Sequence, residues 1–244
     1  MQIVLVGYLA FVLASLVVGT RLLHLAWRRR GHAEAALGVG FFCSGGVGFL
    51  LLVTPLLLPG LGDEALARVR MAGQGVTNTG FLGLYFFNVR VFGGGRPLAT
   101  LAALAGCGLL VLALTSAALH GVEALLRVGS FGYVCTFAGR TGAFLWAAAS
   151  GLQHHSLQRR RLALGLTEPE VVNRFLLWGL YGVFTTALML SGLAGSLLAG
   201  ADGRPPLVTS LALSGFGLAC ATCMWLAFFP PQGYLRRLRA GLGS

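Results

Sequence analysis

The chain contains no lysine, and all 18 of its basic residues are arginine. Retinal proteins hold their chromophore as a lysine Schiff base, so a photoreceptor of that kind is excluded. Acidic residues number only seven, and charged residues of both signs make up 10% of the chain. A soluble globular domain carries about 25% charged residues. Together with a mean hydropathy of +0.80, these shortages predict that lipid is the main solvent, and the all-arginine usage hints at a bacterial source.

Catalytic motifs are also missing: the chain has no GxSxG, HExxH, Walker A or GxGxxG pattern. No carboxylate lies in the middle of an apolar segment, although proton-coupled carriers usually need one there. The sequence therefore favours a non-enzymatic protein, and it predicts no cofactor. All seven acids lie in loops or at segment ends: Glu34, Asp63, Glu64, Glu123, Glu168, Glu170 and Asp202.

The five cysteines all fall within apolar segments, where we expect small hydrophobic residues rather than a disulfide framework. Cys220 and Cys223 form a CxxC pair. A metal or redox site usually needs polar access and further ligands, which this segment lacks. No metal site is predicted from these residues.

Long apolar segments dominate the chain, and a helix needs about 20 mostly apolar residues to span a bilayer. Seven segments qualify. They predict an all-α bundle of seven transmembrane helices as a single domain over residues 1–230, followed by a short basic juxtamembrane tail over 231–244. The segments are Ile3–Trp27, Ala35–Leu58, Met71–Phe92, Leu98–Leu119, Ser130–Leu152, Val171–Leu198 and Leu207–Phe229.

The arginines are distributed unequally between the two sets of connections. Cytoplasmic loops of membrane proteins carry the excess of basic residues. The bias predicts an N-terminus outside and a C-terminus in the cytoplasm of a bacterial inner membrane, and it explains the net charge of +11 without nucleic acid. One set holds twelve, Arg28, Arg29, Arg30, Arg90, Arg96, Arg159, Arg160, Arg161, Arg174, Arg236, Arg237 and Arg239; the other holds four, Arg68, Arg70, Arg127 and Arg204.

The connection between the fifth and sixth segments is predicted to be the longest cytoplasmic loop. Thr167 and Glu170 have the spacing of a capping box at the start of the sixth helix, and Glu170 and Arg174 are spaced for an ion pair. The tail after Pro231 is basic and amphipathic, so we expect it along the inner leaflet. Anionic lipid is the predicted partner of five arginines, at about 1 kcal/mol each: Arg159, Arg160, Arg161, Arg236 and Arg237.

This region carries the only family resemblance in the sequence. The run LGLTEPE at 164–170 and the following VVNRFLLWG at 171–179 resemble a segment of uncharacterised bacterial seven-helix integral membrane proteins. The arrangement of segments is similar to the seven-helix input modules of bacterial signalling proteins, although this chain lacks the output domain that usually follows them. The resemblance implies the seven-helix architecture and carries no known activity.

The third segment has a polar face, and the fifth has an arginine at its centre. Gln74, Asn78 and Tyr85 follow helical spacing and share one face. Arg140 lies ~15 Å of helix from either surface, where a charge needs a partner. One interpretation is structural: amides on the third helix satisfy the guanidinium. The other is an intramembrane anion or carboxylate pocket whose ligand-binding residues are Arg140, Gln74, Asn78 and Tyr85.

Histidines and glycines each leave two interpretations open. His154 and His155 lie at the inner end of the fifth segment, where an interfacial role is favoured over metal, haem or acid–base chemistry. Glycine is frequent, with 37 residues, and small residues let helices approach closely in lipid. Glycines of the second and sixth segments, including Gly192 and Gly195, indicate packing seams within one bundle. A homodimer face on the second segment is the alternative.

These features predict a non-enzymatic sensor or receptor-like protein with a lipophilic or anionic ligand near Arg140. Its arginine-rich inner loops would contact lipid or a cytoplasmic signalling partner. A small-solute transporter with a midplane site is the alternative. A lipid-modifying enzyme using His154 or His155 is a third interpretation.

Overall fold

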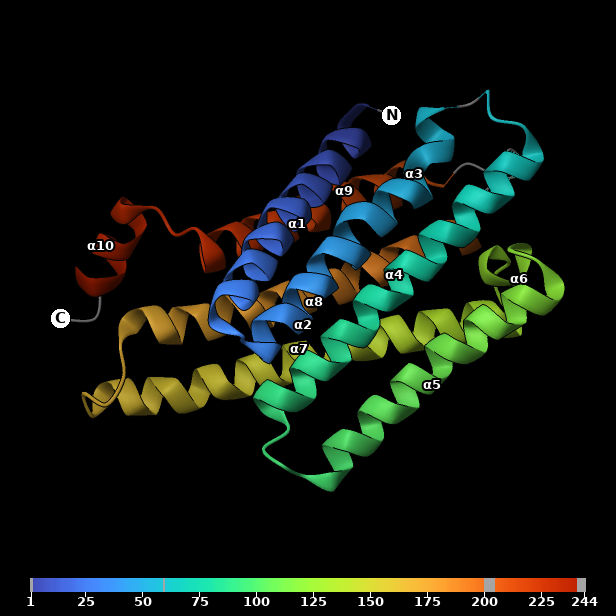
Figure 1. The fold of residues 1–244 in the computed structure, drawn as a ribbon. Helices are drawn as coiled ribbons and strands as arrows, with labels where there is room; N and C mark the ends of the chain where they lie inside the picture. The colour runs from blue at the N-terminus through green and yellow to red at the C-terminus, as the bar shows by residue number, and fades with distance from the viewer. Residues whose placement is uncertain (1, 59, 200–204, 241–244) are drawn as a thin grey trace.

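The structure, a computed structural model, describes residues 2–58, 60–199 and 205–240. Asp202 and Arg204, which entered the sequence predictions, lie outside the described residues. Within these ranges the chain is helical and has no strand, so the all-α class is confirmed. The helices in Figure 1 are α1 Gln2–Arg29, α2 His32–Val39, η1 Gly40–Gly48, α3 Phe49–Leu57, α4 Asp63–Phe92, α5 Pro97–His120, α6 Glu123–Leu126, α7 Phe131–Ala163, α8 Pro169–Leu197, α9 Leu207–Phe228 and α10 Gln232–Ala240.

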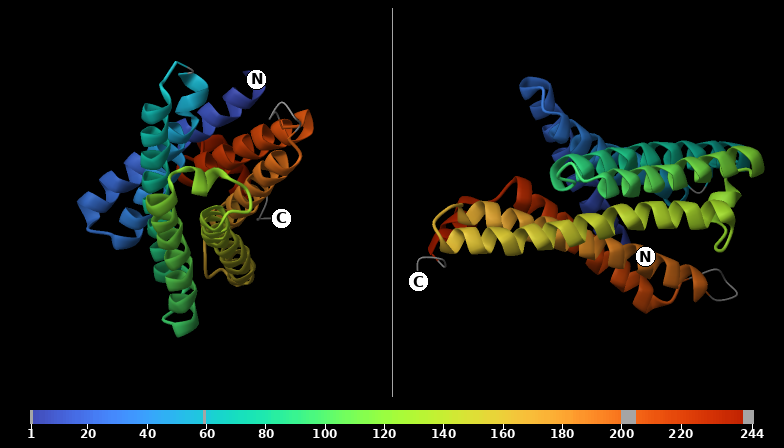
Figure 2. Two further views of the ribbon diagram at one scale, coloured as in Figure 1. Left: turned by 90° about the vertical axis from the view of Figure 1, so that its right-hand side faces the viewer. Right: turned by 90° about the horizontal axis from the view of Figure 1, so that it is seen from below.

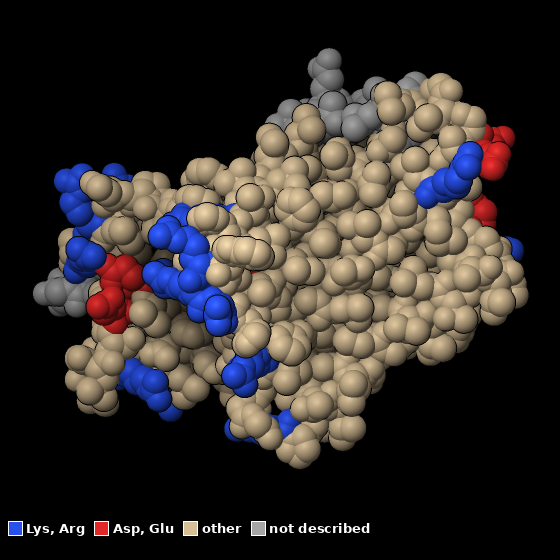
Figure 3. Space-filling view, in the orientation of Figure 1, with Lys and Arg blue, Asp and Glu red and all other residues tan. Residues whose placement is uncertain are grey.

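Five helical segments are long and apolar enough to cross a membrane: Gly7–Arg29, His32–Thr54, Pro97–His120, Pro169–Leu197 and Leu207–Phe228. Helices α4 and α7 are longer, at 30 and 33 residues, but fall outside this set. Figure 3 shows charged side chains at the two ends of the molecule and an almost uncharged band between them. An uncharged band of this kind is typical of a protein whose middle faces lipid.

The long helices alternate in direction and pack as one bundle (Figure 1). Helix α7 contacts both α5 and α8, and it lies between them in Figure 2. Helix α8 also packs on α9, and α9 packs on α1. At the centre of the bundle the fully buried Phe41 meets three aromatic rings edge-on, with centroid separations of 5.5–5.9 Å. These rings belong to Trp178, Tyr181 and Phe228, so the core joins η1, α8 and α9.

Helix α7 is longer than the sequence predicted. It continues through the basic residues 159–161 to Ala163 instead of ending near residue 152. Its end is a Schellman motif: the Leu166 N–H donates to the Arg161 carbonyl and the Gly165 N–H to the Leu162 carbonyl. Gly165 has φ +70°, a conformation that glycine adopts without strain. The connection between α7 and α8 is therefore shorter than predicted, because helix α7 takes up most of it. At residues 164–168 it is still longer than the connections at 30–31 and 93–96 on the same side of the bundle.

The predicted capping box is also wrong. The N-cap of α8 is Glu168, with Pro169 at the first helical position and no side-chain cap. Glu170 accepts a hydrogen bond from Arg239 of α10 at 2.6 Å, and it is this arginine rather than Arg174 that forms its ion pair among the described residues. The carboxylate thus joins two distant segments, which sequence spacing could not indicate.

The second predicted helix contains a π-helical segment, η1, between α2 and α3. Its glycines face α1 and α4: a Cβ on Gly46 would meet Leu16 Cδ2 at 2.6 Å. From the opposite side, a Cβ on Gly80 of α4 would meet the Ser44 nitrogen at 2.5 Å. These glycines therefore serve packing within the chain, and a homodimer through another face stays a prediction.

Glycine also brings α7 and α8 together, at positions that the sequence analysis did not single out. A Cβ on Gly151 would lie 2.7 Å from the Gly179 nitrogen, and one on Gly182 would lie 2.6 Å from the Ala148 nitrogen. A Cβ on Gly192, by contrast, would meet only Leu213 Cδ2, at 3.9 Å. The α7–α8 seam thus depends on close backbone approach, the mode of association expected in lipid.

Gly80→Ala should lower stability, because the added methyl group overlaps the backbone of η1. We expect a loss of about 1–3 kcal/mol, the usual effect of overpacking. Gly75→Ala is the matched control on the same helix, since a Cβ there meets nothing within 4 Å. Thermal unfolding of the detergent-solubilised protein measures both. An equal melting temperature for the two variants would contradict the packing role of Gly80.

Candidate functional site

Arg140 of α7 lies buried against the polar face of α4. Its Nε donates to Asn78 Oδ1 at 3.0 Å, and its Nη2 donates to the same oxygen at 2.7 Å and to Gln74 Oε1 at 2.5 Å. The guanidinium carbon also lies 5.6 Å from the centroid of the Phe81 ring, within range of a cation–π interaction. The two amides named as candidate partners are therefore its partners in the fold.

The rest of the α4 face bonds to backbone carbonyls. Asn78 Nδ2 donates to the Leu110 carbonyl of α5 at 3.4 Å. The Tyr85 hydroxyl donates to the Gly139 carbonyl of α7 at 2.7 Å, and Asn88 Nδ2 donates to the Ala143 carbonyl at 3.1 Å. Tyr85, the fourth predicted site residue, thus belongs to the same seam but bonds backbone rather than Arg140. Each such bond contributes about 0.6 kcal/mol in a membrane protein.

Some polar groups in this seam have no partner among the described residues. Arg140 Nη1 has no acceptor there, while Nε and Nη2 have theirs. Thr136 Oγ1, one helical turn earlier on α7, and Asn88 Oδ1 are buried without a hydrogen bond. The seam is therefore mostly but not fully satisfied, and the structural and anion-pocket interpretations both remain open.

A double-mutant cycle on Arg140 and Asn78 measures how strongly the two side chains are coupled. Arg140→Gln and Asn78→Ala should each destabilise the fold by about 1–3 kcal/mol, because each leaves a buried polar group without its partner. The double variant should lose clearly less than the sum, with a coupling energy of about 1 kcal/mol or more. Denaturant or thermal unfolding supplies the three values. Additive effects would show that the contact contributes nothing.

The two histidines in the C-terminal part of α7 bond to backbone. His154 Nδ1 lies 2.9 Å from the Ser150 carbonyl, and the ring stacks on Phe175 with centroids 5.5 Å apart. His155 Nδ1 lies 3.0 Å from the Val172 carbonyl of α8. These contacts fit the interfacial interpretation, in which the rings join the ends of α7 and α8.

A cleft of about 570 Å³ opens at the end of the bundle that holds α10, between α1, α2, α4, α8 and α9. Its walls are largely aromatic and aliphatic, and three arginines and one acid are its charged residues. The apolar residues include Phe87, Phe92, Phe175, Trp178 and Phe228, and the charged ones are Arg21, Arg29, Glu34 and Arg174.

Arg21 is held in place at this cleft. Its Nη1 donates to the Phe228 carbonyl at 2.9 Å, and its guanidinium carbon lies 4.3 Å from the centroid of the Phe229 ring. The sequence analysis identified neither this cleft nor a role for Arg21. The spacing of Val18, Leu25 and Arg29 around it, which puts them on one helix face, was the available signal.

Comparisons of the chain with protein-family models, with curated proteins and with solved structures found no match. Function must then be argued from the site, because a fold class alone does not imply an activity. The resemblance of residues 164–179 to bacterial seven-helix proteins stays a prediction.

Proposed function

We propose that the protein crosses a bacterial cytoplasmic membrane seven times. Five spans follow from length and composition, and α4 and α7 are the two further ones. Both exceed the roughly 20 residues that a span needs. Their polar side chains bond to each other and to backbone carbonyls within the bundle, which is how membrane proteins accommodate such groups.

We propose an external N-terminus and a cytoplasmic C-terminus. The ends of α1, α4 and α7 and the start of α8 lie together with α10 at one end of the bundle (Figure 1). These segments carry ten of the twelve arginines of the richer set, and the other two, Arg30 and Arg96, lie in the connections that follow α1 and α4. Figure 3 shows basic side chains gathered at that end. The positive-inside rule assigns that end to the cytoplasm.

Reporter fusions test the orientation and the number of spans. Green fluorescent protein fused after Gly94 or at the C-terminus should fluoresce, because both points would be cytoplasmic. Alkaline phosphatase fused after Gly62 should be active, because this point would be outside. Phosphatase activity at the C-terminus would rule out an odd number of spans with this orientation.

We further propose a non-enzymatic, receptor-like role in which the inner cleft binds an amphiphile with an anionic head. The observation that carries this proposal is the pairing of arginines with aromatic walls in one cleft. Arg21, Arg29 and Arg174 would bind the anionic group, and the rings would bind its hydrocarbon part. Ligand pockets have this composition: mainly apolar, with a few convergent polar groups, at volumes of about 300–1,000 Å³.

The cleft is connected to the rest of the bundle through α4. The inner end of α4 supplies Phe87 and Phe92 to the cleft, while its central part is bonded to Arg140. A ligand that draws α1 and α8 together would therefore act on α4, which is hydrogen-bonded to α7. The basic ends of α7 and α10 would pass the change to anionic lipid or to a cytoplasmic signalling partner.

Arg140 is the second place where an anion could bind within this proposal. Its Nη1 has no acceptor among the described residues. A carboxylate there would gain a charge-assisted hydrogen bond. The cleft is favoured because it has a volume of about 570 Å³ and is lined by three arginines, whereas Nε and Nη2 of Arg140 are already bonded.

Thermal unfolding in phosphatidylcholine nanodiscs with added oleate separates the two places. Oleate should stabilise the wild type, by about 2.7 kcal/mol at 100 times its Kd, and uncharged oleyl alcohol should do so much less. Arg174→Gln should remove most of the oleate effect, and Arg96→Gln, a loop control, should keep it. If Arg140→Gln loses the stabilisation by oleate while Arg174→Gln keeps it, the ligand binds at Arg140 and not in the cleft.

Two outcomes would overturn the receptor-like role. Solute flux through the protein in proteoliposomes would indicate a carrier. Phospholipid turnover that disappears in His155→Ala would indicate a lipid enzyme.

A further inference from the structure

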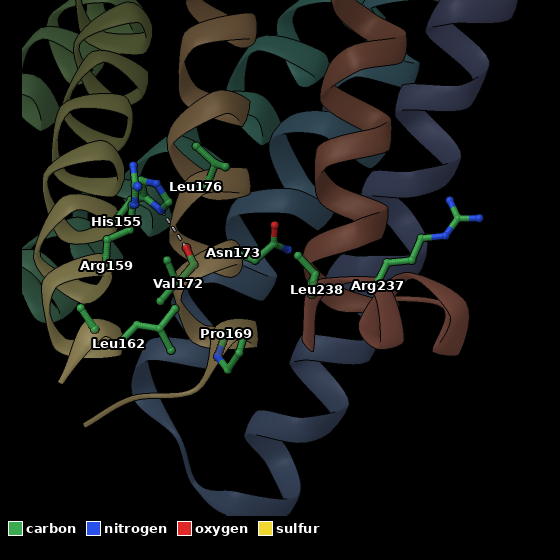
Figure 4. Close-up of a pocket in the computed structure, with 10 residues that line it drawn as sticks. His155, Arg159, Leu162, Pro169, Val172, Asn173, Leu176, Arg237 and Leu238 are labelled. Atoms are coloured by element: carbon green, nitrogen blue, oxygen red, sulfur yellow. Dashed lines mark hydrogen bonds between the residues drawn. The ribbon is translucent and has the colours of Figure 1, made fainter. Parts of the chain in front are cut away.

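A second cavity, of about 630 Å³, lies at the same end of the bundle between α7, α8 and α10 (Figure 4). Helix α7 contributes His155 and Arg159, and the first turns of α8 contribute Val172 and Asn173. Helix α10 closes the third side with Leu238 next to Asn173. Figure 4 shows the Arg237 guanidinium pointing away from the other labelled residues, and Arg159 of α7 is the other arginine that lines the cavity.

The C-terminal helix reaches this position through two polar contacts with α8. Arg239 donates to Glu170 at 2.6 Å, and the Tyr234 hydroxyl donates to Asn173 Oδ1 at 2.9 Å. None of the residues of α10 is buried. Because apolar packing holds α10 so weakly, these contacts and whatever fills the cavity determine where the helix lies.

The polar groups that line the cavity are suited to an anion. Asn173 uses its oxygen for Tyr234, so its Nδ2 keeps two N–H donors, and His155 uses Nδ1 for the Val172 carbonyl. Arg159 has no acceptor among the described residues. No acid lines the cavity. The N-terminus of α8, which begins at Pro169, adds the partial positive charge of a helix dipole.

The remaining walls are hydrocarbon, from Leu162, Ala163, Leu176 and Leu238. An occupant must therefore combine an anionic group with an apolar part and must be available at the cytoplasmic surface. An anionic phospholipid of the inner leaflet has both features, and arginine and amide donors suit its phosphate oxygens.

We propose that the cavity binds the phosphate diester of an anionic phospholipid and that the bound headgroup holds α10 against α8. The site is distinct from the cleft between α1, α4 and α8, and the proposal rests on the orientation proposed above. Arg159 binds the phosphate from α7, Asn173 binds it from α8, and Leu238 covers its glycerol and acyl carbons.

Native mass spectrometry tests the site on full-length protein released from nanodiscs of equal parts phosphatidylglycerol and phosphatidylcholine. The wild type should retain phosphatidylglycerol selectively. Arg159→Gln should reduce the retained fraction about tenfold, the effect of losing one charge-assisted contact. Asn173→Ala should reduce it less. Arg160→Gln, which removes the neighbouring charge outside the cavity, should leave it unchanged.

Equal loss in Arg159→Gln and Arg160→Gln would overturn the site, because it would show diffuse attraction to the basic surface. Equal retention of the two lipids would also overturn it. If millimolar inorganic phosphate displaces phosphatidylglycerol, the site binds a free anion rather than a lipid, and the proposal is overturned. Retention of the lipid in the presence of phosphate supports the proposal. Unchanged thermal unfolding of Arg159→Gln shows that the variant is folded.

Trypsin cleavage after Arg237 tests the link to α10. Cleavage of the wild type should be slower in nanodiscs of phosphatidylglycerol than in those of phosphatidylcholine, and Arg159→Gln should abolish the difference. If the cleavage rate of Arg159→Gln still depended on the lipid, the proposed link between the bound headgroup and α10 would be wrong. Arg174→Gln should leave lipid retention intact while it removes the oleate effect, so each proposal can fail without the other.

Discussion

The guanidinium of Arg140, bonded to two amide oxygens inside an apolar bundle, is the interaction on which the arrangement of α4 and α7 depends. No carboxylate is available to neutralise the charge at that depth, so neutral acceptors surround it. Removing Arg140 would leave both amide oxygens without this donor, and an unpaired polar group in a low-dielectric interior is costly. The two helices with the most polar interiors can then lie among five strongly apolar ones, because they turn their polar faces toward each other.

This contact between α4 and α7 positions two binding places at one end of the bundle. Helix α7, aligned by α4, brings its glycine seam against α8 and continues to Ala163, where His155 joins the first turns of α8. Helix α4, aligned by α7, carries Phe87 and Phe92 to the inner cleft. Two adjacent residues of α8 line different openings: Asn173 lines the α7–α8–α10 cavity, and Arg174 lines the cleft. One helical turn thereby connects the two proposed binding places.

The end of the molecule that holds α10 concentrates both charge and openings, whereas the band around the middle is almost uncharged (Figure 3). A basic surface of this kind attracts anionic lipid over a Debye length, without specificity. Specificity requires enclosed geometry, which here comes from aromatic walls in the cleft and from α10 over the second cavity. The distinction separates arginines that only orient the chain, such as Arg160, from those that line a space, such as Arg159 and Arg174.

Composition and periodicity by themselves determined the helical class, the position of the long apolar segments and the polar face of α4, because these properties are local to each segment. They also identified Gln74 and Asn78 as candidate partners of Arg140, since no acid was available. The π-helical segment, the contact of Arg239 with Glu170, the cleft around Arg21 and the cavity beside Arg159 were decided only by the tertiary structure. Each depends on which faces of helices far apart in the sequence come together, and close packing sets that arrangement across the whole bundle.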